Sequence, residues 1–307
     1  MMTTPLRNVL LFSGLLTLVA ACHQPSGELI GPDPTNGIDV DLGFSSEPFR
    51  GPGPQFGATV TQTKAPPPIS GGTLTVLADG HTAIASDPDR DAIYAVDLTT
   101  QQKLATITLS EDDEPGRAVE DTHGRVHVLL RRGGAVVTLL KSDWSALTRR
   151  DVCTTPRGIA ADPTVDQIYV ACEDGTLATL PGALGTPTRV LHLDRDLRDI
   201  VVRGDSLYVS RFHSAELLNV RVSDGTITAR TTPAAITPVV GSRAGQYFGP
   251  EAAWRLAVGP LDQQVYMLHQ RAFNGVISTT QPGGYGSAGD PCSGSIVHAA
   301  ITQVAPG

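Results

Sequence analysis

The sequence is poor in several residue types on which large classes of protein depend. Of its 307 residues, 5% are aromatic and 18% are charged, and the net charge is −8. This acidic balance disfavours a protein that coats nucleic acid, and the moderate charge content disfavours a highly charged disordered chain. We therefore do not expect nucleic-acid binding. Only the N-terminus has an apolar run long enough to consider, so we do not expect a polytopic membrane protein either.

The sequence also lacks the short motifs that identify many enzymes. It has no Gly-x-Ser-x-Gly elbow, no phosphate loop and no Cys-x-x-Cys-His haem attachment motif. Residues 284–289 have the glycine spacing of a dinucleotide-binding loop, but Asp290 and Pro291 follow in place of a helix. Residues 87–91 resemble the start of a calcium loop, but Ala92 stands where glycine is required, which favours a solvated turn. We therefore predict no catalytic residues, no cofactor and no metal site, and a protein that is not an enzyme.

The N-terminal 21 residues have the features of an export signal. Arg7 precedes an apolar stretch at residues 9–21, which is too short to span a bilayer as a helix. Residues 18–22 (LVAAC) resemble the lipobox of bacterial lipoproteins, which implies that Cys22 is lipidated and anchors the protein to the membrane. Cleavage by an ordinary signal peptidase, with Cys22 an incidental thiol, is the alternative. We expect an exported lipoprotein of the bacterial outer membrane or periplasm.

Residues 22–70 are rich in proline and glycine and show no sustained hydrophobic periodicity. Proline denies hydrogen bonds to a sheet and favours an extended chain, so this segment is predicted to be a semi-rigid tether. The folded domain is predicted to comprise residues 71–307.

An internal repeat of about 40 residues dominates this domain. The second strand of each repeat is expected at Ile84, His127, Tyr169, Tyr208 and Tyr266. Each repeat reads as four short strands separated by turn residues, which predicts an all-β fold, a β-propeller of four-stranded blades. A β-sandwich and a β-helix are the alternatives.

Residues 92–104 (AIYAVDLTTQQKL) and 208–229 resemble the YVTN-type β-propeller repeat. Five blades are recognisable, at about residues 72–110, 114–152, 155–193, 196–231 and 253–303, with an insertion at 232–252. YVTN-like propellers usually have seven blades. A five-bladed ring, degenerate blades hidden in the spacer and insertion, and a chain that stops short of a full ring remain open, and the strand at 296–304 with no closing strand after it favours an incomplete ring.

A disulfide is predicted between Cys153 and Cys172. The expected hairpin of the third blade turns near residues 162–167, which places residues around 156 opposite Cys172. Export to an oxidising compartment makes a disulfide chemically reasonable, and two small buried thiols are the alternative. Cys292 has no evident partner.

Arginine, which supplies 20 of the 23 basic residues, recurs near the start of the first strand of four blades. These residues are Arg117, Arg157, Arg198 and Arg255. In a propeller the innermost strand lines the axis, and its start lies at the same end as the loops between second and third strands, where Arg211, Arg271, Arg131, Arg132, His213 and His269 are expected.

Because the planar guanidinium group suits carboxylates, this end of the axis is predicted to bind an anionic partner. An acidic protein face, a carboxylated ligand and a haem propionate are the candidates. In the alternative interpretation, the arginines pair with acidic residues of the same end, namely Asp112, Asp113, Glu114, Glu173, Asp196 and Asp199.

Together these features predict a non-enzymatic, lipid-anchored binding or scaffold protein of the bacterial cell envelope. The segments at 253–255, 268–271, 283–286 and 296–298 also resemble propeller regions that precede a di-haem, cytochrome c peroxidase-like domain in exported bacterial proteins. That resemblance implies an alternative, in which the chain is the propeller accessory portion of a periplasmic c-type cytochrome or peroxidase-like redox protein, with a cytochrome as partner. Its haem domain would lie outside this chain.

Overall fold

The computed structural model describes residues 73–239, 244–259, 264–276 and 296–304, all of which belong to one compact unit, Ala65–Gly307. In these ranges the chain forms β-strands and no helix, so no described segment is a helix able to cross a membrane. The predicted signal, Cys22, the tether and Cys292 lie outside the described residues.

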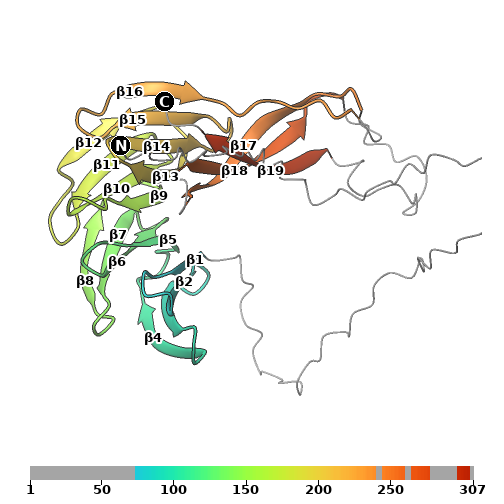
Figure 1. Cartoon of the computed structure of the whole chain (residues 1–307). Helices are drawn as coiled ribbons and strands as arrows, with labels where there is room; N and C mark the ends of the chain where they lie inside the picture. Colours follow the sequence, from blue (N-terminus) through green and yellow to red (C-terminus); the bar gives the residue numbers. More distant parts are fainter. Residues whose placement is uncertain (1–72, 240–243, 260–263, 277–295, 305–307) are drawn as a thin grey trace, which may run out of the picture. The chain divides into compact units, whose positions relative to one another are not determined.

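The strands form five antiparallel sheets that follow one another along the chain (Figure 1). The first sheet consists of β1 (Leu74–Val76), β2 (Thr82–Asp87), β3 (Ala92–Asp97) and β4 (Gln102–Thr108). The second consists of β5 (Pro115–Glu120), β6 (Arg125–Leu130), β7 (Ala135–Leu140) and β8 (Ala146–Asp151). The third consists of β9 (Pro156–Ala161), β10 (Gln167–Cys172), β11 (Thr176–Pro181) and β12 (Arg189–His192).

The fourth sheet consists of β13 (Leu197–Arg203), β14 (Ser206–Arg211), β15 (Leu217–Arg221) and β16 (Ile227–Thr231). The fifth consists of β17 (Phe248–Val258), β18 (Val265–Phe273) and β19 (Val297–Val304). In every sheet each strand pairs with the next one in sequence, so each sheet is a meander built from hairpins.

Short polar turns with a carboxylate at their start connect the strands. At the β3–β4 turn, Asp97 Oδ1 accepts hydrogen bonds from the backbone N–H groups of Thr99 and Thr100 at 2.7 and 3.0 Å. At the β15–β16 turn, Asp224 Oδ1 accepts from Thr226 N–H at 2.9 Å, and Gly225 adopts the left-handed φ of +79° that such a turn requires. In both turns an aspartate therefore supplies a local hydrogen-bond acceptor for the backbone.

The core lies between the sheets, and the two-residue period of the strands builds it. In β6, Val126 and Val128 pack towards the first sheet, whereas Leu129 joins the cluster shared with the third sheet. In β10, Ile168 and Val170 face the second sheet, and Tyr169 faces the fourth. Successive side chains of a strand point to opposite faces, so one strand supplies two adjacent cores.

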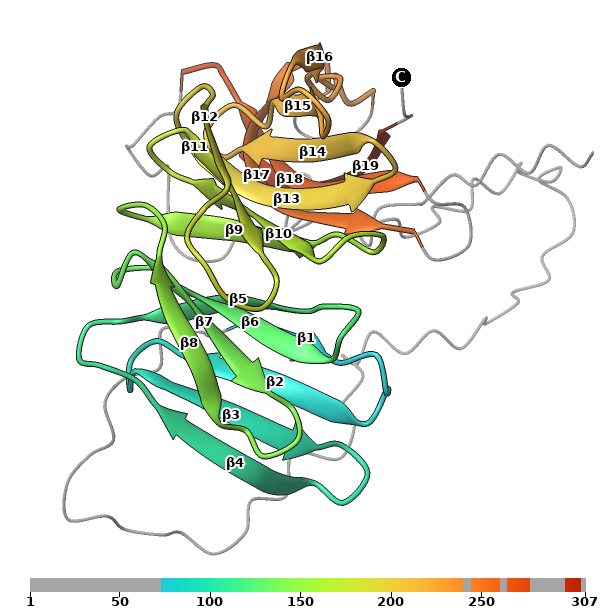
Figure 2. The same ribbon diagram turned by 90° about the vertical axis from the view of Figure 1, so that its left-hand side faces the viewer.

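Neighbouring sheets contact one another chiefly through their inner strands: β1 and β2 with β5, β5 with β9, β9 with β13 and β13 with β17. Figure 2 shows the sheets following one another in chain order. These sheets are the blades of a β-propeller, as predicted. The first and fifth blades share no comparable contact among the described strands, so the described blades do not close a ring. Leu74 and Ile301, on these two terminal blades, are 65% and 60% exposed.

The fifth blade departs from the expected pattern. Its first strand begins at Phe248 rather than near residue 253, because Phe248 is fully buried, stacks on His298 at a ring distance of 4.6 Å and pairs with Ile236 across an isolated bridge. Three strands of this blade are described, whereas the four preceding blades have four each.

Candidate functional site

The first strands of four blades are interrupted where the sequence places its recurring arginines, near the start of β5, β9 and β13 and in the middle of β17. In the third blade Pro156 pairs with Cys172 and Gly158 with Ala171, which leaves Arg157 without a partner in the ladder. In the fourth blade Leu197 pairs with Arg211 and Asp199 with Ser210, which leaves out Arg198. Such β-bulges bend the strand and re-aim the side chain of the extra residue.

The register divides the four predicted arginines into two structural positions. Arg157 and Arg198 occupy the bulge itself, and the corresponding residue of the fifth blade is Trp254 rather than Arg255. In the second blade the interruption covers Gly116 and Arg117, and the pairing of Ala118 with Val128 aligns Gly116 with the bulge. Arg117 and Arg255 therefore stand one residue further along, at the position of Gly158 and Asp199. A spacing of about 40 residues could not reveal this one-residue offset.

Asp199 is the centre of the second position. It is 3% exposed, forms an ion pair with Arg117 of the second blade, and accepts a hydrogen bond from Leu256 N–H of the fifth blade at 2.7 Å. Arg255 Nε lies 3.9 Å from the same carboxylate oxygen. Arg117 also donates to Trp254 O at 2.6 Å. The inner strands of the second, fourth and fifth blades thus meet at one buried carboxylate.

Gly158 allows the third blade to approach this centre. A Cβ atom at Gly158 would lie 2.8 Å from Asp199 Cα, which is closer than atoms can pack. Glycine is therefore required at this position by the contact between β9 and β13.

The two bulge arginines have different companions. Arg157 donates through Nε to Glu173 Oε2 at 3.1 Å, and Glu173 directly follows β10 of the same blade. Arg198 lies over the rings of Phe212 and Trp254, with its guanidinium carbon 4.9 and 5.6 Å from the ring centres. No described carboxylate lies within 4 Å of the Arg198 guanidinium group, and its buried Nε has no hydrogen-bond partner.

The guanidinium groups around the axis lie close enough to affect one another's pKa. The pKa of Arg117 is lowered to about 10, chiefly by burial; the charge of Asp199 opposes this shift, and the charges of Arg255 and Arg198 add to it. Burial also lowers the pKa of Arg198, and the charge of Arg157 adds to this shift. The charges of Asp199 and Asp196 oppose this shift, but neither carboxylate lies within 4 Å of the Arg198 guanidinium group. We call this end of the axis, which carries Arg117, Arg157, Arg198 and Arg255, the arginine end.

A cavity of about 250 Å³ opens at the arginine end between the third and fourth blades. It is lined by Arg157, Glu173, Asp196, Leu197, Arg198, Phe212 and His213. A second cavity of about 290 Å³ adjoins Arg157 on its other side and includes Glu114, Arg131 and Arg132. Arg157 thus separates two hollows, and the one that also contains Arg198 holds a guanidinium group without a described carboxylate partner.

Several predicted anion-binding residues are already engaged within the protein. Arg211 donates to Glu216 Oε2 at 2.7 Å and to Arg195 O at 3.1 Å. Arg271 donates to Ala234 O at 3.0 Å, and it lies inside β18 together with His269, so the expectation that these two residues sit in a loop is wrong. Asp113 pairs with Arg149 and Asp112 with Arg132. At these positions the structure matches the alternative interpretation, in which arginines pair with local carboxylates.

Cys153 and Cys172 form a disulfide, the pair for which the sequence predicts a bridge. Cys172 pairs in the ladder with Pro156, as the predicted hairpin required. The bridge lies next to the site, because Cys172 directly precedes Glu173 and Cys153 precedes the strand that carries Arg157.

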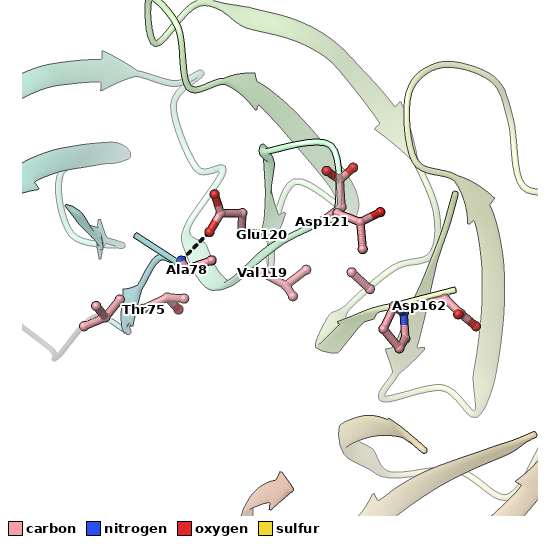
Figure 3. A pocket seen from close by; sticks show the side chains of 10 residues that line it. Thr75, Ala78, Val119, Glu120, Asp121 and Asp162 are labelled. Atoms are coloured by element: carbon pink, nitrogen blue, oxygen red, sulfur yellow. Dashed lines mark hydrogen bonds between the residues drawn. The ribbon is translucent and has the colours of Figure 1, made fainter. Parts of the chain in front are cut away.

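Another cavity, of about 420 Å³, lies at the opposite end of the inner strands. Figure 3 shows Thr75, Ala78, Val119, Glu120, Asp121 and Asp162 along its wall. Its carboxylates are occupied: Glu120 accepts from Ala78 N–H at 2.5 Å, and Asp162 accepts from Tyr169 OH at 3.1 Å. This end offers less to a ligand than the arginine end.

Asp121, His123 and Asp166 lie close enough together to hold a metal ion. However, the guanidinium group of Arg125 pairs with both carboxylates of this group. A cation is therefore already supplied by the protein, and these residues fit an ion-pair network better than a metal centre.

Asp121, His127 and Thr138 form a hydrogen-bonded series that resembles the arrangement of a nucleophilic triad. His127 Nε2 lies 3.0 Å from Asp121 Oδ2, and its Nδ1 lies 2.9 Å from Thr138 Oγ1. Both His127 and Thr138 are fully buried, so no substrate can reach the hydroxyl group. The series holds the second blade together rather than performing chemistry.

Sequence reasoning missed Phe212 and Trp254, the two rings beside Arg198. The register makes Phe212 the counterpart of Glu173, and Trp254 the counterpart of Arg198 itself. A comparison of the residues that directly follow each second strand could have found Phe212, whereas Trp254 required the position of the bulge.

No known protein-family model matches the chain, and no curated protein matches it in sequence. Solved structures do resemble it. Hydrazine synthase from Kuenenia stuttgartiensis aligns with a TM-score of 0.62 and 14% identity over 80% of this chain and 66% of that one. A streptogramin B lyase aligns with a TM-score of 0.52 and 14% identity over 67% of both chains. This chain therefore spans about two thirds of the length of either neighbour, and the similarity supports the β-propeller fold alone.

Proposed function

We propose that this chain is a non-enzymatic binding or scaffold protein of the bacterial cell envelope that holds an acidic group of a partner protein at the arginine end of its propeller axis. The observation that carries the proposal is Arg198. Its half-buried guanidinium group lies over two aromatic rings beside a cavity, with no described carboxylate within 4 Å. A charged group in this position gains from an incoming carboxylate without first losing an internal ion pair.

The envelope part of the proposal has its support in the sequence, where an apolar stretch ends in LVAAC at residues 18–22. A propeller is a rigid support for a binding site, because its inner strands are fixed by the blades on either side. The Asp121–His127–Thr138 series is buried beyond the reach of a substrate, which supports the view that these three residues are not catalytic.

A second candidate is a propeller accessory portion of a c-type cytochrome or peroxidase-like redox protein. It is favoured by the same guanidinium groups, because haem propionates are carboxylates. Cys-x-x-Cys-His motifs in the reading frame after residue 307 would support it. A stop codon there without a cytochrome gene nearby would leave the scaffold proposal.

The proposal predicts that Arg198→Gln weakens binding of an acidic peptide roughly tenfold, the size expected for loss of a charge-assisted hydrogen bond. The measurement is fluorescence anisotropy of the full chain with a fluorescein-labelled hexaglutamate peptide at several salt concentrations. Affinity of the unaltered protein should fall as salt rises, and the variant should show a shallower dependence.

Arg221→Gln is the matched control, since Arg221 pairs with Asp224 at the opposite end of the fourth blade. It removes the same charge from the protein but not from the cavity. Equal binding by the two variants, at unchanged thermal stability, would contradict the proposal.

A further inference from the structure

The residue that follows the second strand decides whether each bulge arginine has a carboxylate partner. In the third blade this residue is Glu173, which pairs with Arg157, and in the fourth it is Phe212, which stacks under Arg198. Two equivalent guanidinium groups therefore face one cavity, but only Arg157 has a carboxylate partner within its own blade.

The geometry of the Arg157–Glu173 ion pair favours replacement of Glu173 by another carboxylate. Both hydrogen bonds from Arg157, through Nε and Nη2, end on the same oxygen, Oε2, rather than on the two oxygens of the carboxylate. The two-oxygen arrangement is the stronger one. The side chain of Glu173 is also 51% exposed, and exposed pairs contribute little to stability.

The size and charge of the cavity limit what can enter. Its volume of about 250 Å³ is below that of most sites for drug-sized molecules, but it has room for one acidic side chain. Asp196, which accepts hydrogen bonds from the backbone and ring of His213 at 2.7 and 2.8 Å, adds a negative charge to its wall. A singly charged carboxylate therefore suits the cavity better than a dianion such as phosphate.

We propose that the cavity between Arg157 and Arg198 binds one carboxylate side chain of an acidic protein segment, and that Glu173 is an intramolecular competitor which this carboxylate displaces from Arg157. The inference rests on the proposed function and adds a mode of regulation to it. The incoming carboxylate takes the free donors of Arg198 and one side of Arg157, while Glu173 swings into solvent. Glu173 thereby weakens binding, and a substitution that removes its charge strengthens binding.

The test is Glu173→Gln, which keeps the size of the side chain and removes its charge. With the hexaglutamate probe and the full chain, we expect roughly threefold tighter binding, the size of an exposed ion pair. Asp224→Asn is the matched control, because Asp224 is an exposed carboxylate paired with Arg221 at the opposite end. It changes the net charge equally and should leave the affinity unchanged.

The double variant Glu173→Gln/Arg157→Gln separates competition from general electrostatics. If Glu173 acts by occupying Arg157, the double variant binds no more tightly than the Arg157→Gln single variant, which is the reference because the ligand also contacts Arg157. A gain that persists there, or a gain equal to that of Asp224→Asn, overturns the inference. In that case a loss of binding in Arg198→Gln still supports the proposed function, whereas no loss in Arg198→Gln overturns both.

Competition experiments identify the ligand class. Unlabelled hexaglutamate should displace the probe, whereas hexaglutamine should not. Displacement by inorganic phosphate at lower concentration than by free glutamate would contradict the carboxylate assignment. Thermal unfolding of each variant checks that the fold is intact, which we expect because the Glu173 side chain lies outside the core.

Discussion

At the scale of single residues, different blades use different side chains to donate a hydrogen bond to the equivalent turn carboxylate. The carboxylate at the turn after the first strand needs a donor from the second strand. In the third blade Tyr169 OH donates to Asp162, and in the second blade His127 takes this position and contacts Asp121. Both are buried, but only histidine titrates near neutral pH.

His127 should make stability depend on pH. Burial lowers its pKa below 6.5, with the charges of Arg150 and Arg125 acting in the same direction and Asp121 opposing them. Near pH 6.5 His127 therefore binds a proton in the unfolded chain but remains neutral in the folded protein. As a result, the free energy of unfolding falls as the pH drops from 7 towards 5.5. Asp121 acts lower in pH: burial favours its neutral form, but hydrogen bonds from His127 and Arg125 outweigh this and hold its pKa below the usual range.

We predict that His127→Gln flattens the pH dependence of the free energy of unfolding between pH 7 and 5.5. Glutamine keeps a donor for Asp121 but cannot be protonated. Urea unfolding followed by circular dichroism at several pH values measures the slope. A smaller slope should remain, because burial also lowers the pKa of His269, and His269→Gln provides the comparison. An unchanged slope in His127→Gln would show that His127 does not control this dependence.

At the scale of the structural element, the first strands carry the site because they are irregular. In a regular strand the alternation of side chains would fix the direction of Arg157 and Arg198. The bulge changes this direction, so that both side chains line the cavity. The disulfide supports this irregular segment, since it ties the chain before β9 to the end of β10. The bridge encloses a sequence separation of 19 residues.

Removal of the disulfide in a Cys153→Ala/Cys172→Ala variant should lower the free energy of unfolding by about 3 kcal/mol, because a loop of this length regains entropy in the unfolded chain. Urea unfolding measures the loss. Reduction of the unaltered protein with dithiothreitol serves as the control and should produce most of the same change, although Cys172 is also buried in the core. If the variant and the oxidised protein unfold at the same urea concentration, the bridge does not stabilise the fold.

At the scale of the whole molecule, the axis joins blades that are not neighbours. Asp199 of the fourth blade pairs with Arg117 of the second, and Arg117 in turn donates to Trp254 O of the fifth. Loss of one partner from a buried ion pair is costly, so these residues fix the separation of the inner strands. Arg198 lies outside this ion pair, so the arginine that fixes the inner strands differs from the one that we propose binds a partner.

The position of the protein in the cell is a property of the whole chain. We predict that Cys22→Ser moves the full chain from the membrane fraction to the soluble fraction of a bacterial host, because acyl chains supply the membrane affinity. Fractionation followed by immunoblotting measures the change. Retention of Cys22→Ser in the membrane fraction would contradict the lipoprotein part of the proposal.

The repeat pattern was sufficient to predict the blades. Ile84, His127, Tyr169, Tyr208 and Tyr266 all lie in second strands, as expected. Alternating apolar residues and turn signals are local properties, and they remain readable because each blade repeats them. The boundary at Phe248 was missed because it depends on a ring contact with His298, which lies 50 residues away in the sequence.

The sequence by itself determined the fold class, the blade period and the gathering of arginines at one end, because these follow from side-chain periodicity and the direction of the strands. Only the tertiary structure decided which contacts each arginine makes. A bulge shifts the register by one residue, and this shift gives Arg117 to the buried Asp199 and leaves Arg198 over Phe212 and Trp254. The charge that remains available to a partner is thus set by contacts between blades, which local periodicity does not encode.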